Sequence, residues 1–250
     1  MLPILTLWQR ELVRFYRDKT RVIGALTPPV IFWLLIGSGL GGSFSMKGGQ
    51  SYLQYFFSGT LVLIVLFTSI FSCMSIIEDR REGFLQSVLV APIPRLSIVL
   101  GKVLGASTVG FLQGLSFLVF APLTGLHAPL WGYAAAAAAL LLCSIGLTGL
   151  GFIIAWKLDS TQGFHAVMNL FLMPMWLMSG SLFPYATSPA WLQWVIRLNP
   201  VTYGVTALQL SLSPGQEGLA SLGCCFIVLT GFAVVMMLVS AAVAGKREAR

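Results

Sequence analysis

VLGASTVGFLQGLSFLVFAPLTGLHAPLWGYAAAAAALLLCSIGLTGLGFIIAW (103–156) lies between Lys102 and Lys157 and contains no Asp, Glu, Lys or Arg. An apolar helix crosses a hydrocarbon layer about 30 Å thick with roughly 20 residues, so this run has room for two crossings and a short connection. The strands of an outer-membrane barrel alternate between apolar and polar residues. The central stretch YAAAAAALLL (133–142) shows no such alternation. The run therefore predicts two membrane-spanning helices.

Charge is missing from other long stretches as well. Of the whole chain, 57% of residues are hydrophobic and 9% are charged, whereas soluble proteins average about 25% charged residues. The chain is thus predicted to be an all-α polytopic membrane protein, forming one domain over residues 1–250. Six transmembrane helices are expected, at 22–42, 55–77, 98–124, 131–156, 164–183 and 219–244.

The basic residues between these spans gather on one side. With six crossings, all of the Lys and Arg residues except Lys47 and Arg197 fall on the side that carries both termini. Because cytoplasmic loops carry an excess of Lys and Arg, both termini are expected in the cytoplasm. The membrane is expected to be a plasma (bacterial inner) membrane. Net charge of +7 is therefore attributed to topology and not to nucleic-acid binding.

The segment before the first span, 3–20, has an amphipathic helical pattern. Apolar side chains including Trp8 share one face, and Arg10, Arg14 and Arg17 lie on the opposite face. This pattern predicts an interfacial helix, with the apolar face in lipid and the arginines toward headgroups or a partner. A generic positively charged anchor is the alternative.

Motifs for catalysis and metal binding are absent from the sequence. His127 and His165 are the only ionisable residues outside the charge clusters at the span ends, which disfavours an ion-coupled carrier. No GxSxG, HExxH or GxxxxGK[ST] motif occurs, and the four cysteines have no zinc-site spacing. We expect no catalytic residue, no metal site and no ATPase motif in this chain.

The stretch EDRREGFLQSVLVAPIPRLSIVLGK (78–102) links the second and third spans. Five consecutive charged residues precede apolar Phe84, Leu85 and Val88, and prolines follow. The pattern predicts a short amphipathic helix on the cytoplasmic face that docks a soluble partner; an ordinary connecting loop is the alternative.

These motifs resemble the permease subunits of type 2 ABC exporters, which carry drugs, lipids and polysaccharides. The resemblance rests on Asp79-Arg80-Arg81-Glu82-Gly83 with the later Ala91-Pro92, Arg95 and Gly101-Lys102, on MSGSLFPYATSPAWLQWVIRLNPVTYG (178–204), and on the N-terminal WQRELVRFYRD (8–18).

The resemblance implies that 78–90 is the coupling helix, seated in a groove of a separate ATP-binding cassette ATPase that binds ATP and Mg. The implied contact residues are Arg80, Arg81, Glu82, Gly83, Phe84 and Leu85. It also implies a second permease subunit, in a homodimer or heterodimer, and export of a hydrophobic or amphiphilic substrate: a drug, a lipid or a lipid-linked glycan.

Residues 184–205 are expected to form an external re-entrant element that caps the translocation path, with an aromatic surface belt as the alternative. Its candidate residues are Pro184, Trp191, Trp194, Asn199, Pro200 and Tyr203. The path is placed at the interface between the two permease subunits, with Thr60, Thr68, Ser72 and Asn169 as candidate lining residues. Membrane lipid is a further expected partner. A non-transporting scaffold subunit is the competing hypothesis, and an ion-coupled carrier a third.

Overall fold

A computed structural model describes residues 2–39, 51–90, 93–182, 185, 188–215 and 218–245. Within these ranges the structure is helical, with no strand. Its elements are α1 (Leu2–Arg17), α2 (Lys19–Gly39), α3 (Tyr52–Arg81), α4 (Phe84–Val90), α5 (Arg95–Leu118), the 3₁₀ turn η1 (Ala121–Thr124), α6 (Leu130–Lys157), α7 (Thr161–Trp176), the π-helical turn η2 (Leu177–Ser181), α8 (Ala190–Leu198), α9 (Pro200–Leu212) and α10 (Leu222–Gly245).

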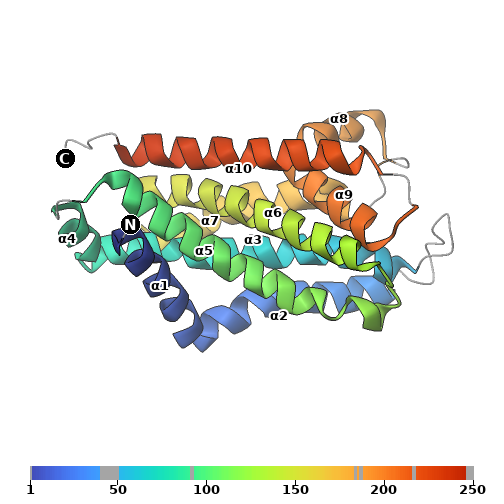
Figure 1. Cartoon of the computed structure of the whole chain (residues 1–250), viewed down its shortest axis with the longest axis horizontal. Helices are drawn as coiled ribbons and strands as arrows, with labels where there is room; N and C mark the ends of the chain where they lie inside the picture. The colour runs from blue at the N-terminus through green and yellow to red at the C-terminus, as the bar shows by residue number, and fades with distance from the viewer. Residues whose placement is uncertain are drawn as a thin grey trace.

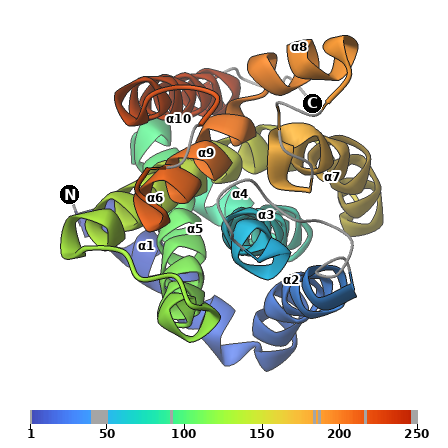
Figure 2. The ribbon, with the colours of Figure 1, turned by 90° about the vertical axis from the view of Figure 1, so that its right-hand side faces the viewer.

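The long helices form one elongated bundle around α3 (Figures 1 and 2). Helices α2, α5, α6, α7 and α9 all pack against α3, and α10 lies outside, against α6 and α9. Figure 1 shows α1, α4 and the C-terminal end of α10 at one end of the bundle, which we call the α4 end. Helix α8 lies at the opposite end, called the α8 end. The predicted grouping of the two termini with the 78–102 loop is thus present.

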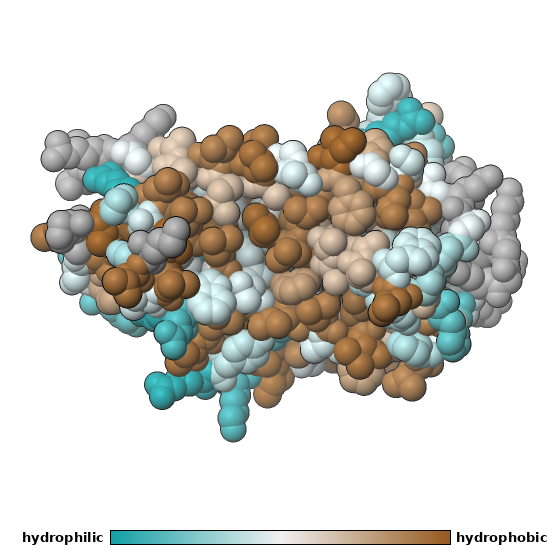
Figure 3. Space-filling view, viewed as in Figure 1, coloured by the Kyte–Doolittle hydropathy of each residue, from teal (hydrophilic) through white to brown (hydrophobic). Residues whose placement is uncertain are grey.

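The bundle exposes apolar surface where a soluble protein would expose polar groups. Of the most apolar part of α3, 83% of residues are buried, against 17% in α2 and in α10. Apolar side chains cover most of the middle of the face seen in Figure 3. Exposed apolar surface on this scale is stable in hydrocarbon and not in water, as expected of a multi-pass membrane protein.

Five described helices, not six, are long and apolar enough to span a membrane: α2, α3, α5, α6 and α10. The predicted fifth span, 164–183, differs. Its helix α7 has 16 residues, contains Pro174 and passes into the π-helical turn, where Met178 and Gly180 have non-helical backbone angles. A proline removes a backbone donor and crowds the preceding turn, which favours such a break.

Other predicted boundaries also shift. The predicted span 98–124 ends as a helix at Leu118, and the separate turn η1 contains Pro122. The predicted external region 184–205 contains α8, but α9 continues to Leu212 and buries its side chains in the bundle. Packing of α9 against α6 and α10 explains why an interrupted sequence is nonetheless partly internal.

The predicted interfacial helix 3–20 is interrupted at Asp18, between α1 and α2. The Asp18 carboxylate accepts hydrogen bonds from the Thr20 side chain and from the amides of Thr20 and Arg21, so it caps the start of α2. The Thr20 hydrogen bond is the main cause that lowers the pKa of Asp18 below its usual value.

Helix α1 packs against α5 through two glycines. A Cβ at Gly101 would lie 2.6 Å from Leu7 Cβ, and one at Gly105 would lie 2.8 Å from Glu11 Cβ. The Trp8 indole also donates a 3.0 Å hydrogen bond to Thr108 Oγ1. Helix α1 buries Leu7, Glu11 and Phe15. Of the apolar face predicted to lie in lipid, Phe15 is therefore buried in the protein, whereas Leu5 and Tyr16 are exposed.

We predict that Gly101→Leu destabilises the chain by about 1–3 kcal/mol, because the added side chain overfills the α1–α5 contact. The free energy of unfolding, measured by SDS titration of the purified chain in detergent, checks this. Gly231→Leu on α10 is the matched control, since a Cβ there meets no atom within 4 Å. Equal stability of the two variants would contradict the close approach.

Candidate functional site

The α4 end contains a short helix set apart from the long ones (Figure 1). Helix α3 ends at Arg81, and Glu82 and Gly83 form the turn that leads into α4. Gly83 has φ of 77°, a left-handed conformation that favours glycine. The predicted coupling segment 78–90 is therefore two structural parts, the end of α3 and the helix α4.

Helix α4 rests on the bundle by one face. Leu85 is 2% exposed, and Phe84 packs against the core. The Arg10 guanidinium of α1 lies 3.7 Å from the centre of the Phe84 ring, a cation–π contact. The outer face presents Gln86, Ser87 and Val90, with Val90 87% exposed. One face is thus fixed to the protein and the other is open for a partner.

Arg80 and Arg81 connect α3 to the turn between α6 and α7. Arg80 donates hydrogen bonds to the Asp159 carboxylate at 2.9 Å and to the carbonyl oxygens of Leu158 and Trp156 at 3.2 and 2.5 Å. Arg81 Nε donates to the Asp159 carbonyl at 3.1 Å, while its side chain remains exposed. The Arg80 guanidinium is therefore used within the chain, whereas Arg81 and Glu82 are at the surface.

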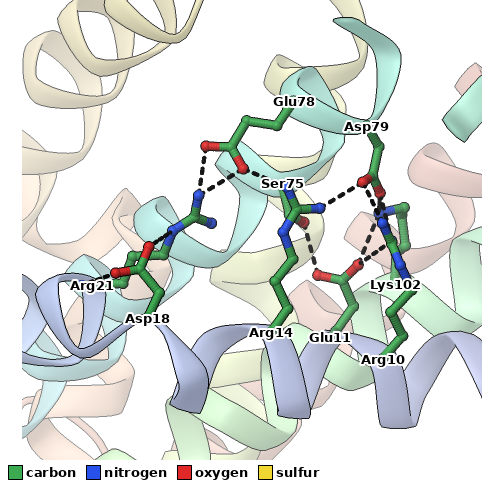
Figure 4. A network of polar contacts seen from close by, with 9 residues as sticks. All are labelled: Arg10, Glu11, Arg14, Asp18, Arg21, Ser75, Glu78, Asp79 and Lys102. Carbon is green, nitrogen blue, oxygen red and sulfur yellow. Dashed lines mark hydrogen bonds and ion pairs between the residues drawn. The ribbon is translucent and has the colours of Figure 1, made fainter. Parts of the chain in front are cut away.

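Behind α4 lies a network of charged side chains, drawn in Figure 4. Asp79, which is fully buried, accepts hydrogen bonds from Arg10 at 2.7 and 2.8 Å, from Arg14 at 2.5 Å and from Lys102 at 2.5 Å. Lys102 also donates to Glu11 at 2.9 Å. The Asp79 hydrogen bonds are the main cause that raises the pKa of Arg10 above its usual value. One carboxylate thus joins α1, α3 and α5.

The network continues to α2 through Glu78. Its carboxylate accepts from Arg14 at 2.8 Å and from Arg21 at 2.5 and 2.6 Å, and Arg21 Nε also donates to Asp18 at 2.9 Å. Ser75 donates to Glu11 at 2.7 Å. Four cations (Arg10, Arg14, Arg21 and Lys102) face four carboxylates (Glu11, Asp18, Glu78 and Asp79), so the network is electrically balanced.

Sequence reasoning assigned Arg10 and Arg14 to headgroups or a partner and gave Lys102 no ion pair. In the structure both arginines turn toward α3, and only Arg17 of the three is exposed. Two acidic residues at the end of an apolar span require nearby cations, because an unpaired buried charge is costly. From the sequence, this requirement could have predicted that Glu78 and Asp79 form ion pairs, but it does not specify with which cations.

The α8 end contains the predicted re-entrant residues. Asn199 caps α9 by accepting from the Val201 amide at 3.0 Å, and its Nδ2 donates to the carbonyls of Met175 and Met178 at 2.5 and 3.4 Å. Pro200 is the first residue of α9. Asn199 thus supplies hydrogen bonds to carbonyls beside the break after α7.

Aromatic residues occupy the surface of the same end. Trp191 and Trp194 of α8 are both 65% exposed, and the Tyr203 hydroxyl donates to the Arg197 carbonyl at 2.9 Å. Pro184 lies outside the described residues. The exposed tryptophans fit the interfacial aromatic alternative as well as a re-entrant element.

Three of the four candidate path residues lie inside the bundle. Thr60 and Thr68 are fully buried and donate to carbonyls of their own helix, and Ser72 is 5% exposed. Asn169 on α7 is exposed. The prediction that Thr60, Thr68 and Ser72 face a subunit interface was therefore wrong, because α3 is surrounded by other helices of its own chain.

We predict that Lys102→Met lowers the free energy of unfolding by about 3–5 kcal/mol, because it leaves buried carboxylates with fewer cations. SDS titration of the purified chain measures the effect. Lys157→Met is the control, since Lys157 is exposed near the same end. If the two variants are equally stable, Lys102 does not hold the network together.

Comparison with known proteins identifies the family of this sequence. The model of the ABC-2 type transporter family matches residues 3–213. "Putative transport permease ycf38" of Cyanophora paradoxa is 28% identical over 214 residues, which cover 84% of this chain and 74% of that protein. "Nodulation protein J" of Rhizobium leguminosarum bv. viciae is 23% identical, covering 98% of this chain and 95% of that protein.

A further relative is named for drug resistance. "Daunorubicin resistance ABC transporter permease protein DrrB1" of Streptomyces coeruleorubidus is 24% identical over 237 residues, covering 92% of this chain and 81% of that protein. The family match spans most of the chain, and the described residues include five helices long and apolar enough to cross a membrane. The chain belongs to the ABC-2 type transporter family, whose members form the membrane subunit of ABC transporters.

Proposed function

We propose that this chain is the membrane-spanning subunit of an ATP-driven exporter that moves a hydrophobic or amphiphilic substrate out of the cytoplasm. A separate ATP-binding cassette subunit supplies the energy, binding ATP and Mg, and docks at the α4 end. The α4 end then faces the cytoplasm, in agreement with the basic residues gathered there. The proposed membrane is the bacterial inner membrane.

The seating of α4 is the observation that carries this proposal. A partner that touches the outer face of α4 meets Gln86, Val90 and the neighbouring charges of Arg81 and Glu82. Charged groups at the rim of an interface give orientation, and an apolar centre gives burial. The outer side of α4 offers the apolar Val90 beside the charges of Arg81 and Glu82, so it fits a docking element better than a plain connecting loop.

Movement of α4 would reach several helices at once. Phe84 meets Arg10 of α1, and Arg10 binds Asp79 of α3. Arg80 ties the end of α3 to the α6–α7 turn. Because the Arg10–Asp79 ion pair is buried at Asp79, it resists sliding and separates only at high cost. Displacement of α4 would therefore tilt the attached helices together.

The names of two relatives support the proposed direction and substrate class. A Bacillus subtilis relative that is 27% identical over 179 residues is named a linearmycin resistance permease protein. DrrB1 is named a daunorubicin resistance permease protein. Resistance through a permease is most simply export of the drug. A lipid or a lipid-linked glycan remains within the same proposed class of amphiphilic cargo.

A second permease subunit completes the proposed assembly, as a homodimer or a heterodimer. The second subunit and lipid can contact the exposed surfaces of the bundle. These include α2, which is weakly buried, and α7, where Asn169, Leu170 and Phe171 are exposed. With Thr60, Thr68 and Ser72 inside the bundle, Asn169 is the one candidate of that group retained for the path.

We predict that Arg81→Glu or Glu82→Arg lowers export of a candidate amphiphilic drug at least tenfold while protein abundance in the membrane stays unchanged. Both side chains are exposed beside α4, where the ATPase would dock, and neither packs in the core. Charge reversal should therefore weaken docking and leave the fold intact. Drug accumulation in cells that co-express the ATPase, with abundance followed by immunoblot, measures both quantities. Lys19→Glu, an exposed charge reversal on α2, is the control.

Copurification separates the steps of the proposal. The wild-type chain should retain the co-expressed ATPase, and the Arg81→Glu/Glu82→Arg double variant should lose it or lose drug-stimulated hydrolysis. Normal transport and normal ATPase binding in both single variants and in the double variant would refute docking at α4. A bound ATPase that never responds to any cargo would instead favour a scaffold subunit.

A further inference from the structure

A small recess opens beside the ionic network at the junction of α1, α2, α3 and α5. Its lining residues are Glu11, Arg14, Phe15, Arg21, Ser72, Ser75 and Ala106. Its cavity volume is about 10 Å³. That is close to the smallest volume that holds one water molecule. The recess is therefore too small for an organic ligand.

Ser72 gives the recess an unsatisfied polar group. The residue is 5% exposed, and its hydroxyl has no hydrogen-bond partner among the described residues. Neighbouring hydroxyls on α3 are satisfied: Ser69 donates to the Val65 carbonyl and Ser75 donates to Glu11. An orphaned hydroxyl at this depth costs about 1–3 kcal/mol unless a further group reaches it.

The other polar lining groups have hydrogen-bonding capacity to spare. Arg21 uses its Nε and Nη2 in the ion pairs with Asp18 and Glu78, and a guanidinium has five N–H donors in all. The Glu11 oxygens each accept one hydrogen bond, from Lys102 and Ser75, and a carboxylate has about four acceptor positions. A molecule in the recess thus has both donors and acceptors available.

Charge decides what kind of molecule fits. The four cations and four carboxylates of the network already balance, so an added ion would leave a net charge in a poorly solvated place. A neutral molecule that both donates and accepts avoids that cost. Water meets the limits of size, charge and hydrogen bonding together.

We infer that this recess binds one ordered water molecule, which hydrogen-bonds to Ser72 and to the Glu11, Arg14 or Arg21 side chain. The water joins α3 to α1 or α2 beside the direct ion pairs and satisfies the Ser72 hydroxyl. Ser72 is thereby a water ligand in the α1–α3 contact instead of a residue of the translocation path. This inference does not depend on the proposed function.

High-resolution cryo-electron microscopy of the full chain in lipid nanodiscs tests the inference directly. A density peak within hydrogen-bond distance of Ser72 Oγ and of one charged lining group is expected in the wild type. Ser72→Ala should lose the peak. Ser69→Ala is the matched control on the same helix and should retain it, because Ser69 bonds to Val65 and Thr148 and does not line the recess.

Hydroxyl-radical labelling by X-ray irradiation provides a second readout. Phe15 lines the recess but is 3% exposed, so radicals from bulk water reach it poorly, whereas a bound water generates them alongside its ring. Phe15 should be labelled in the wild type and in Ser69→Ala, and the labelling should be lost in Ser72→Ala. Phe57, which is fully buried and does not line the recess, should stay unlabelled.

Three results would overturn the inference. One is an empty recess in a map that shows ordered waters elsewhere, with Phe15 unlabelled. Another is a Ser72 hydroxyl that turns to donate to a carbonyl of α3. The third is a peak that strengthens when chloride is replaced by bromide, since that result would assign the recess to an anion.

Discussion

At the α4 end, the buried carboxylate of Asp79 accepts hydrogen bonds from Arg10, Arg14 and Lys102 and so joins α1, α3 and α5. In a poorly solvated place, separating such charges leaves each without water or partner, which costs several kcal/mol. The arrangement of α1 follows from this constraint. The close approach at Gly101 and Gly105 brings α1 near enough for Glu11 to reach Lys102.

The rest of the bundle is arranged in layers around that fixed end. Helix α3 is surrounded by its own chain, whereas α2 and α10 are largely exposed to the surroundings of the bundle. Helix α2 is tied to α3 by the Arg21–Glu78 ion pair near one end. Helix α2 also packs against α3 toward its other end, where the Trp33 indole donates a hydrogen bond to the Leu53 carbonyl. The proposed docking of an ATPase on α4 would act on the end with the Arg21–Glu78 ion pair.

The sequence predicted the helical membrane class, the grouping of both termini with the 78–102 loop, and a short amphipathic helix after the second span. Those features depend on periodicity and on charge-free length, which are local. The sequence also indicated an interruption of the fifth span at Ser179 and Gly180, which the structure has as the π-helical turn after α7. The burial of α9 was missed, since hydropathy does not report how a neighbouring helix satisfies freed carbonyls. Asn199 does so for Met175, which is far away in the sequence.

What the sequence by itself determined is which segments belong in lipid and which carry charge, because transfer of each side chain from water is a property of that residue alone. It also determined that Asp79 and Lys102 stand at the edges of apolar segments. Only the tertiary structure decided which charges meet. Ion pairing depends on distance, and Arg10, Asp79 and Lys102 come together because three helices pack side by side.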